Sequence, residues 1–206
     1  MEKDKLSTES IIKQAAMEVF LKDGFDGARM QKIADLAGVN KAMLHYYFSS
    51  KDVMFEKIFA EAMSDLVPHI EKIMNMDIPL IEKLKAFVRI HVKQQIENPK
   101  LAAFCFNEMG KNPERVLSQM EALEPMQRTL KLFFAQYENE VKAGNLVEYS
   151  PMHLFTFIQG LIDYYFISKP FFESYLCPNH ADLSIDFEKN LPEQICKFLE
   201  NALTKK

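Results

Sequence analysis

Glycine and proline are scarce in this sequence of 206 residues, which contains six glycines, nine prolines and no tryptophan. So few glycines are unfavourable for an all-β chain, because tight turns between strands depend on them. The three cysteines, Cys105, Cys177 and Cys196, are far apart, and no pair has C-x-x-C spacing. The sequence therefore indicates neither a zinc knuckle nor a redox dithiol, and isolated cysteines are typical of a reducing cytosol.

Long apolar runs are also missing. The most apolar stretch, 152–168, is interrupted by His153, Gln159 and Asp163 and is shorter than the roughly 20 residues that cross a bilayer. The charged first five residues do not resemble a signal peptide. We therefore expect a soluble, cytoplasmic protein that does not bind a membrane, with this stretch as a buried helix.

The charge is weakly acidic overall but unevenly distributed. Lys and Arg number 25 and Asp and Glu 29, which gives a net charge of −4. Between residues 27 and 51, however, four cations outnumber a single acid, Asp35, for a local net charge of +3. These cations are Arg29, Lys32, Lys41 and Lys51. A short basic segment on an acidic chain is typical of a module that contacts phosphates.

Helical periodicity dominates the chain, and no strand-like alternation of useful length occurs. Ile12, Ala15, Ala16 and Val19, for example, recur at spacings of three and four and form one apolar helix face. Caps, glycines and prolines then set the helix limits. The predicted helices cover about residues 8–23, 30–37, 41–48, 51–73 with a kink or division at Pro68, 79–97, 100–109, 113–142 with a break near Pro125, 151–168 and 192–203. We predict an all-α fold with an irregular stretch over about residues 177–190.

Residues 24–51 carry the functional signal, GFDGARMQKIADLAGVNKAMLHYYFSSK. Gly38 suits the positive φ of a tight turn between two short helices, and Val39 can fill the angle between them. The second of these helices places a cation and amphipathic rings within two turns, at Lys41, His45 and Tyr46, while Met43, Leu44 and Phe48 can pack inward. This is the layout of a helix-turn-helix, whose second helix enters the major groove of DNA.

Residues 10–59 resemble the N-terminal domain of the TetR family of transcriptional regulators. The shared pattern is an apolar face ending at Phe20, then Gly24-Phe25, Ile33-Ala34, Ala37-Gly38-Val39, Lys41, Leu44, Tyr47-Phe48, Lys51 and Phe55. The resemblance implies a three-helix DNA-binding domain, 1–50, followed by a larger ligand-binding and dimerisation domain, 51–206. It also implies a homodimer, mostly a repressor, that leaves a pseudo-palindromic operator when a small molecule binds.

The resemblance and the local charge together give a set of expected DNA contacts. Family members commonly contact DNA at the positions of Asn40, Lys41, Tyr46 and Tyr47 and contact a phosphate at Lys51. The full expected set is Arg29, Lys32, Asn40, Lys41, His45, Tyr46, Tyr47 and Lys51. Three positions depart from the family pattern, with Ala28 for a common Thr, Ala42 for a common Gly and His45 for a common Tyr, so the operator sequence cannot be carried over.

The larger domain carries aromatic stripes on successive predicted helices. Taken one by one, most of these residues are expected in a plain core, but together they match the apolar walls of a small-molecule pocket. We expect an apolar effector between the helices at 79–97 and 151–168. The candidate contacts are Phe87, His91, Phe104, Asn107, Phe133, Tyr137, Phe157 and Gln159.

The last two major helices carry apolar residues at helical spacing, namely Leu154, Phe155, Ile158, Leu161, Ile162, Ile195, Leu199 and Leu203. In TetR-like proteins the corresponding helices form a four-helix dimer interface. A packed pair of helices within one chain is the alternative.

Catalytic and metal-binding patterns are missing from the sequence. The five histidines form no H-x-x-x-H or E-x-x-H pair, and no glycine-rich phosphate loop or nucleophile elbow occurs. We therefore expect no enzyme activity, no metal and no cofactor. The sequence leaves open the alternative of an all-α small-molecule or lipid-binding protein, or an enzyme, that does not bind DNA.

Overall fold

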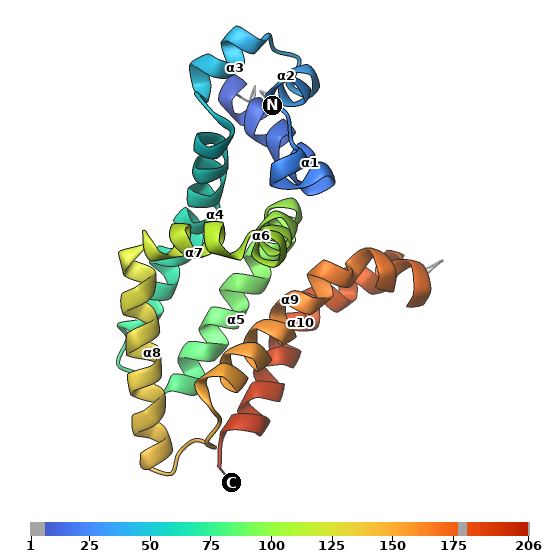
Figure 1. Cartoon of the computed structure of the whole chain (residues 1–206). Coiled ribbons are helices and arrows are strands. Elements are labelled where there is room, and N and C mark those ends of the chain that lie inside the picture. The colour runs from blue at the N-terminus through green and yellow to red at the C-terminus, as the bar shows by residue number, and fades with distance from the viewer. Residues whose placement is uncertain (1–6, 177–180, 206) are drawn as a thin grey trace. The chain divides into compact units, whose positions relative to one another are not determined.

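The computed structural model describes residues 7–176 and 181–205, and these form ten α-helices (Figure 1). Within these residues no strand forms, and one isolated bridge joins Leu146 to Thr204. The predicted all-α class is therefore confirmed. In chain order the helices are α1 (Thr8–Gly27), α2 (Met30–Ala37), α3 (Lys41–Tyr47), α4 (Lys51–Met74), α5 (Leu80–Glu97), α6 (Pro99–Lys111), α7 (Pro113–Glu121), α8 (Glu124–Lys142), α9 (Pro151–Leu176) and α10 (Ala181–Leu203).

Local chemistry sets the limits of the first helices as predicted. The Ser7 hydroxyl accepts a hydrogen bond from the backbone N–H of Ser10 and caps α1. Gly24 has φ 72° and interrupts the last turns of α1, and Gly38 has φ 67° and ends α2. The Asn40 side chain accepts from the N–H of Met43 at 2.8 Å and starts α3. The helix-turn-helix over α2 and α3 therefore follows from caps and glycines that the sequence displays.

The helices group into two compact units. Unit 1 comprises Met1–Ser64 and Lys100–Ala122, and unit 2 comprises Asp65–Pro99 and Leu123–Lys206. This division differs from the predicted boundary after residue 50, because α6, α7 and the first part of α4 fold with the N-terminal helices. The physical reason is a shared apolar core, in which the Phe104 ring of α6 lies 5.8 Å from Phe20 and 5.1 Å from Phe55.

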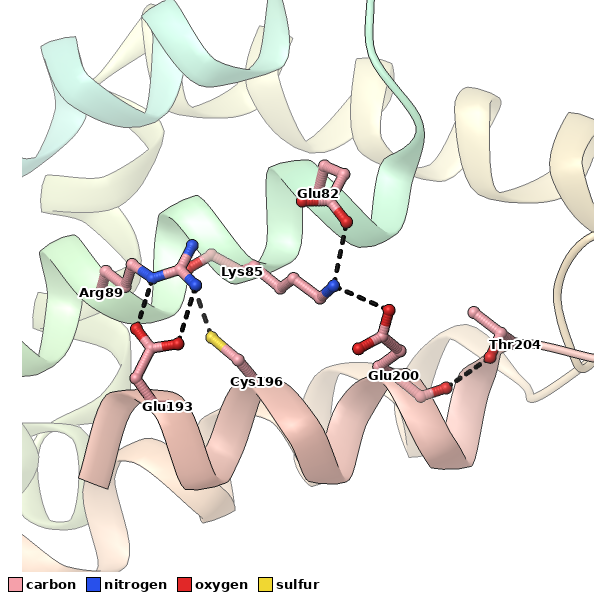
Figure 2. A network of polar contacts seen from close by, with 7 residues as sticks. All are labelled: Glu82, Lys85, Arg89, Glu193, Cys196, Glu200 and Thr204. Atoms are coloured by element: carbon pink, nitrogen blue, oxygen red, sulfur yellow. Dashed lines mark hydrogen bonds and ion pairs between the residues drawn. The ribbon is translucent and has the colours of Figure 1, made fainter. Parts of the chain in front are cut away.

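Unit 2 is built around α5, which packs against α8, α9 and α10. A row of exposed ion pairs flanks the α5–α10 contact (Figure 2). Lys85 donates to Glu82 of its own helix and to Glu200 of α10, and Arg89 makes a two-pronged contact with Glu193 of α10. Exposed pairs of this kind contribute little each, so the buried apolar contacts supply most of the stability.

The predicted limits of the last two helices are wrong. α9 does not end at residue 168 but continues through Pro170, and α10 begins at Ala181, before Pro192. A proline inside a helix loses one hydrogen bond, but contacts between the two extensions favour both of them. The Tyr165 ring lies 4.7 Å from that of Phe187, and Lys169 donates to Glu188 at 2.6 Å. These contacts join residues about twenty positions apart, so the periodicity of one helix did not reveal them.

Candidate nucleic-acid interface and buried polar cluster

The outer face of α3 presents the side chains expected for DNA recognition. Leu44 is buried in the core of unit 1, whereas Lys41, His45 and Tyr46 are exposed. Tyr46 is 84% exposed, which is unusual for a ring of this size and leaves it free to contact a partner. Met43 is also exposed, so its predicted inward orientation is wrong.

Four other predicted DNA contacts differ from one another in exposure and in hydrogen-bond partners. They are Asn40, Arg29, Lys32 and Tyr47. The side-chain oxygen of Asn40 caps α3, so its amide N–H groups are the atoms that could reach DNA. Arg29 is exposed at the start of α2, and Lys32 donates to the Asp23 carboxylate at 2.5 Å. Tyr47 is half-buried, with its ring 5.2 Å from that of Tyr46. Their DNA contacts stay predictions.

The ammonium group of Lys51 makes hydrogen bonds to the backbone of the same chain. Its Nζ donates to the backbone carbonyl oxygens of Phe25 at 2.6 Å, Ala28 at 3.2 Å and Asp26 at 3.3 Å. A lysine ammonium has three N–H donors, so these carbonyls engage all of them. The geometry therefore does not support the predicted phosphate contact of Lys51. The ammonium instead stabilises the corner that joins α1 to α2.

Arg115 of α7 contacts the same corner and was missed by the sequence analysis. Its guanidinium carbon lies 3.5 Å from the centre of the Phe25 ring, and its Nη1 donates to Asp52 at 2.7 Å. Stacking on a ring and pairing with a carboxylate are both typical of arginine. No local pattern marks Arg115, because its partners lie more than sixty positions away in the chain.

The predicted effector residues are divided between the two units. Phe104 and Asn107 lie on α6 in unit 1, and Phe104 is fully buried in the core of that unit. Phe104 therefore belongs to the core of unit 1, and its predicted contact with an effector stays a prediction. The hydrophobic contacts of the N-terminal helices account for its burial.

The remaining predicted effector residues lie in unit 2, where Phe87 packs against a core that includes Phe133 and Tyr137. Phe133 is core, and the Tyr137 hydroxyl bonds to backbone atoms of Val147 and Tyr149, so it holds the segment between α8 and α9. Phe157 is 48% exposed and stacks on the ring of His153. Gln159 is half-buried.

His91 belongs to a cluster of buried polar side chains between α5 and α9. Gln95 donates through Nε2 to Asp163 Oδ1 at 2.8 Å, and His91 Nε2 lies 3.5 Å from the same oxygen. All three side chains are buried, with His91 9% exposed, Gln95 4% exposed and Asp163 3% exposed. His91 Nδ1, Gln95 Oε1 and Asp163 Oδ2 have no hydrogen-bond partner among the described residues.

Burial changes the titration of both ionisable members of this cluster. Desolvation lowers the pKa of His91 to about 4, so the imidazole is neutral at pH 7. Desolvation raises the pKa of Asp163 to about 7, although the hydrogen bond from Gln95 opposes the rise. Buried polar groups are normally satisfied, so three unpartnered atoms in one cluster call for an explanation.

Partial signals for this cluster are present in the sequence. His91 was an expected effector contact, and Gln95 follows it by four residues, which places both on one helix face. Asp163 is one of the polar residues that interrupt the most apolar stretch of the chain. That the side chains on α5 and α9 meet depends on helix packing, which periodicity does not determine.

α9 and α10 carry both buried and exposed apolar side chains. Leu154, Ile158, Ile195 and Leu199, which were expected at a dimer interface, are buried in the core of unit 2 instead. The alternative of packing within one chain is thus the correct one for these residues. The large apolar side chains that remain exposed on the two helices include Phe155, Tyr164, Ile167, Phe171 and Phe198.

The described residues show neither a membrane-spanning helix nor a metal-binding cluster. No helix within residues 7–176 and 181–205 is long and apolar enough to span a membrane. The same residues include no group of three or more His, Cys, Asp or Glu side chains arranged to hold a metal ion.

Comparisons with known proteins agree with the helix-turn-helix geometry. Residues 12–58 match the family model described as bacterial regulatory proteins, tetR family. The chain is 26% identical over 155 residues to the HTH-type transcriptional regulator RutR of Escherichia coli K12, covering 75% of this chain and 71% of RutR. It is 46% identical over 48 residues to the HTH-type transcriptional repressor NicS of Pseudomonas putida, covering 23% of each chain.

Solved structures share the whole fold. The fatty acid degradation regulator FadR from Bacillus halodurans superposes with a TM-score of 0.62 at 24% identity, covering 94% of this chain and 97% of FadR. The fold, the α3 face and the sequence relatives together define a helix-turn-helix, DNA-binding transcriptional regulator. Its N-terminal domain is that of the TetR family, as the sequence predicted.

Proposed function

We propose that the protein is a cytoplasmic, dimeric repressor that binds a pseudo-palindromic operator through α3 and leaves it when a small molecule binds unit 2. The observation that carries the DNA-binding part is the outer face of α3. Lys41, His45 and Tyr46 are exposed there on a helix that buried Leu44 fixes to the core. Repression is supported by the match of this domain to the repressor NicS.

The test of DNA recognition is selection of bound fragments from genomic DNA, followed by affinity measurements on the selected duplex. Removing a base contact costs about 1–3 kcal/mol, so Tyr46→Ala should weaken specific binding about 5- to 150-fold. Lys93→Met is the matched control, because Lys93 is an exposed residue of α5 in unit 2. Unchanged affinity of the Tyr46 variant would assign recognition to another surface.

The proposed dimer rests on the exposed apolar face of α9 and α10. Exposed aromatic side chains such as Phe171 and Phe198 mark a surface that a partner covers. Phe198→Glu should yield monomers in sedimentation experiments, because an unpaired charge inside an interface is costly. Leu132→Glu, at an exposed apolar position of α8, should remain dimeric. If the Phe198→Glu variant remains a dimer, the dimer interface lies on another surface.

The proposed effector response rests on the buried polar cluster of unit 2. A ligand releases DNA only if it binds the non-binding conformation more tightly, since equal affinity for both conformations changes nothing. A coupling of about 1–3 kcal/mol would lower operator affinity about 5- to 150-fold. α4 contributes residues to both units, so it is a candidate element for the coupling.

A further inference from the structure

We propose that the cluster of His91, Gln95 and Asp163 binds the cationic, N–H-bearing end of the effector, such as an amine or an amidine. The inference rests on the proposed function, because it concerns the ligand to which the regulator responds. It refines the expectation of an apolar effector into an amphipathic base with an apolar body and a positively charged, hydrogen-bond-donating end.

Two of the unpartnered atoms of the cluster are oxygen acceptors. Gln95 uses Nε2 to donate to Asp163, which leaves its carbonyl oxygen Oε1 available. His91 Nε2 lies 3.4 Å from Gln95 Nε2 and 3.5 Å from Asp163 Oδ1, and its Nδ1 has no partner among the described residues. Gln95 Oε1 and Asp163 Oδ2 are therefore two oxygen acceptors that remain without a donor. A ligand with several N–H groups can satisfy such a set, whereas a carboxylate ligand cannot.

The cluster also lacks a Lys or Arg partner for Asp163 among the described residues. Asp163 is 3% exposed, and the described residues form no Lys or Arg ion pair with it. The cations on nearby helices have other partners, since Arg89 pairs with Glu193 and Lys169 with Glu188. Neutral His91 supplies no charge. Desolvation raises the pKa of Asp163 to about 7, and a cationic ligand would offset that desolvation cost by stabilising the ionised carboxylate.

The surroundings favour an apolar body on the ligand. The Phe87 ring meets the imidazole of His91 edge to face at 5.2 Å, and Phe87 is only half-buried. The neighbouring cluster of unit 2 is built from aliphatic and aromatic side chains. Binding sites for small molecules typically combine such walls with a few polar groups that fix orientation.

The test uses benzamidine as the probe, because it joins an aromatic ring to a planar cation with four N–H donors. Benzoate and benzyl alcohol have the same ring with an anionic and a neutral polar group. Calorimetric titration and thermal unfolding of the full-length protein should show binding of benzamidine and not of the other two. Hydrogen bonds to a charged group contribute about 1.5–3 kcal/mol, so Asp163→Asn should weaken benzamidine binding about 10- to 150-fold.

Asp77→Asn is the matched control, because it removes the same charge from an exposed residue of unit 2 and should bind benzamidine like the wild type. Equal affinity in the Asp163 and Asp77 variants, tighter binding of benzoate than of benzamidine, or no benzamidine binding to the wild type would each overturn the proposal. Operator binding is measured in parallel on all three proteins without any probe. If the wild type does not bind the operator, the proposed function is contradicted. If it binds the operator but does not bind benzamidine, only this inference is contradicted.

Discussion

Two sets of polar groups, one in each unit, differ in how far the fold supplies their hydrogen-bond partners. At the corner of α1 and α2 in unit 1, the ammonium of Lys51 meets three carbonyl oxygens, so all its donors are used within the fold. In the cluster of unit 2, three polar atoms of His91, Gln95 and Asp163 have no partner among the described residues. The comparison teaches that a polar side chain matched by the fold supports architecture, whereas an unmatched one is available to a ligand.

The largest expected effect tests whether Phe104 belongs to the core of unit 1. Removing a fully buried phenylalanine costs about 3–5 kcal/mol, so Phe104→Ala should lower the free energy of unfolding by that amount. Phe157→Ala, at a half-exposed ring of unit 2, should cost far less. Urea unfolding followed by circular dichroism measures both. If the two variants have similar free energies of unfolding, the assignment of Phe104 to the core of unit 1 is contradicted.

A second substitution tests the internal use of Lys51. Lys51→Met should lower the free energy of unfolding by about 1–3 kcal/mol, because it leaves carbonyl oxygens without their donor. Lys41→Met, at an exposed residue of α3, should leave stability within about 0.5 kcal/mol of the wild type.

The same pair separates architecture from DNA contact. Each lost phosphate contact lowers the slope of log affinity against log salt by about 0.9. We expect this change for Lys41→Met and not for a folded Lys51→Met protein. A changed slope in the Lys51 variant, with unchanged stability, would restore the phosphate contact.

The pH dependence of stability sharpens the comparison for the cluster of unit 2. Between about pH 4 and 6.5, folding keeps a proton on Asp163, whose pKa is raised to about 7, and excludes one from His91, whose pKa is lowered to about 4. The two effects oppose each other. Rising pH costs stability through Asp163 and increases it through His91, so their sum is nearly flat in the wild type.

Single substitutions should reveal the two slopes separately. Asp163→Asn leaves the His91 effect, so stability should rise with pH by at most about 1.4 kcal/mol per pH unit between about pH 4 and 6.5. His91→Asn should give a slope of opposite sign over the same interval. Denaturant unfolding at several pH values measures both slopes relative to the wild type. Parallel profiles of all three proteins would show that these groups do not titrate as burial predicts.

Much of the fold and of the exposed face of α3 could be predicted from local patterns. The cap at Asn40, the glycine at Gly38 and the alternation of buried and exposed residues in α3 act within a few residues of one another. The effector region could be predicted only in part. His91 belongs to the buried polar cluster and Phe104 to the core of unit 1, and a buried ring looks the same in sequence in either role.

By itself the sequence determined the all-α class, the limits of α2 and α3 and the helix-turn-helix, because these depend on caps, positive-φ glycines and spacing along one segment. Only the tertiary structure decided that α9 continues through Pro170 and that Lys51 donates to carbonyls 23–26 positions earlier in the chain. It also decided that Gln95 of α5 meets Asp163 of α9. Such contacts join atoms from distant segments, and their free energy depends on helix packing that no local pattern encodes.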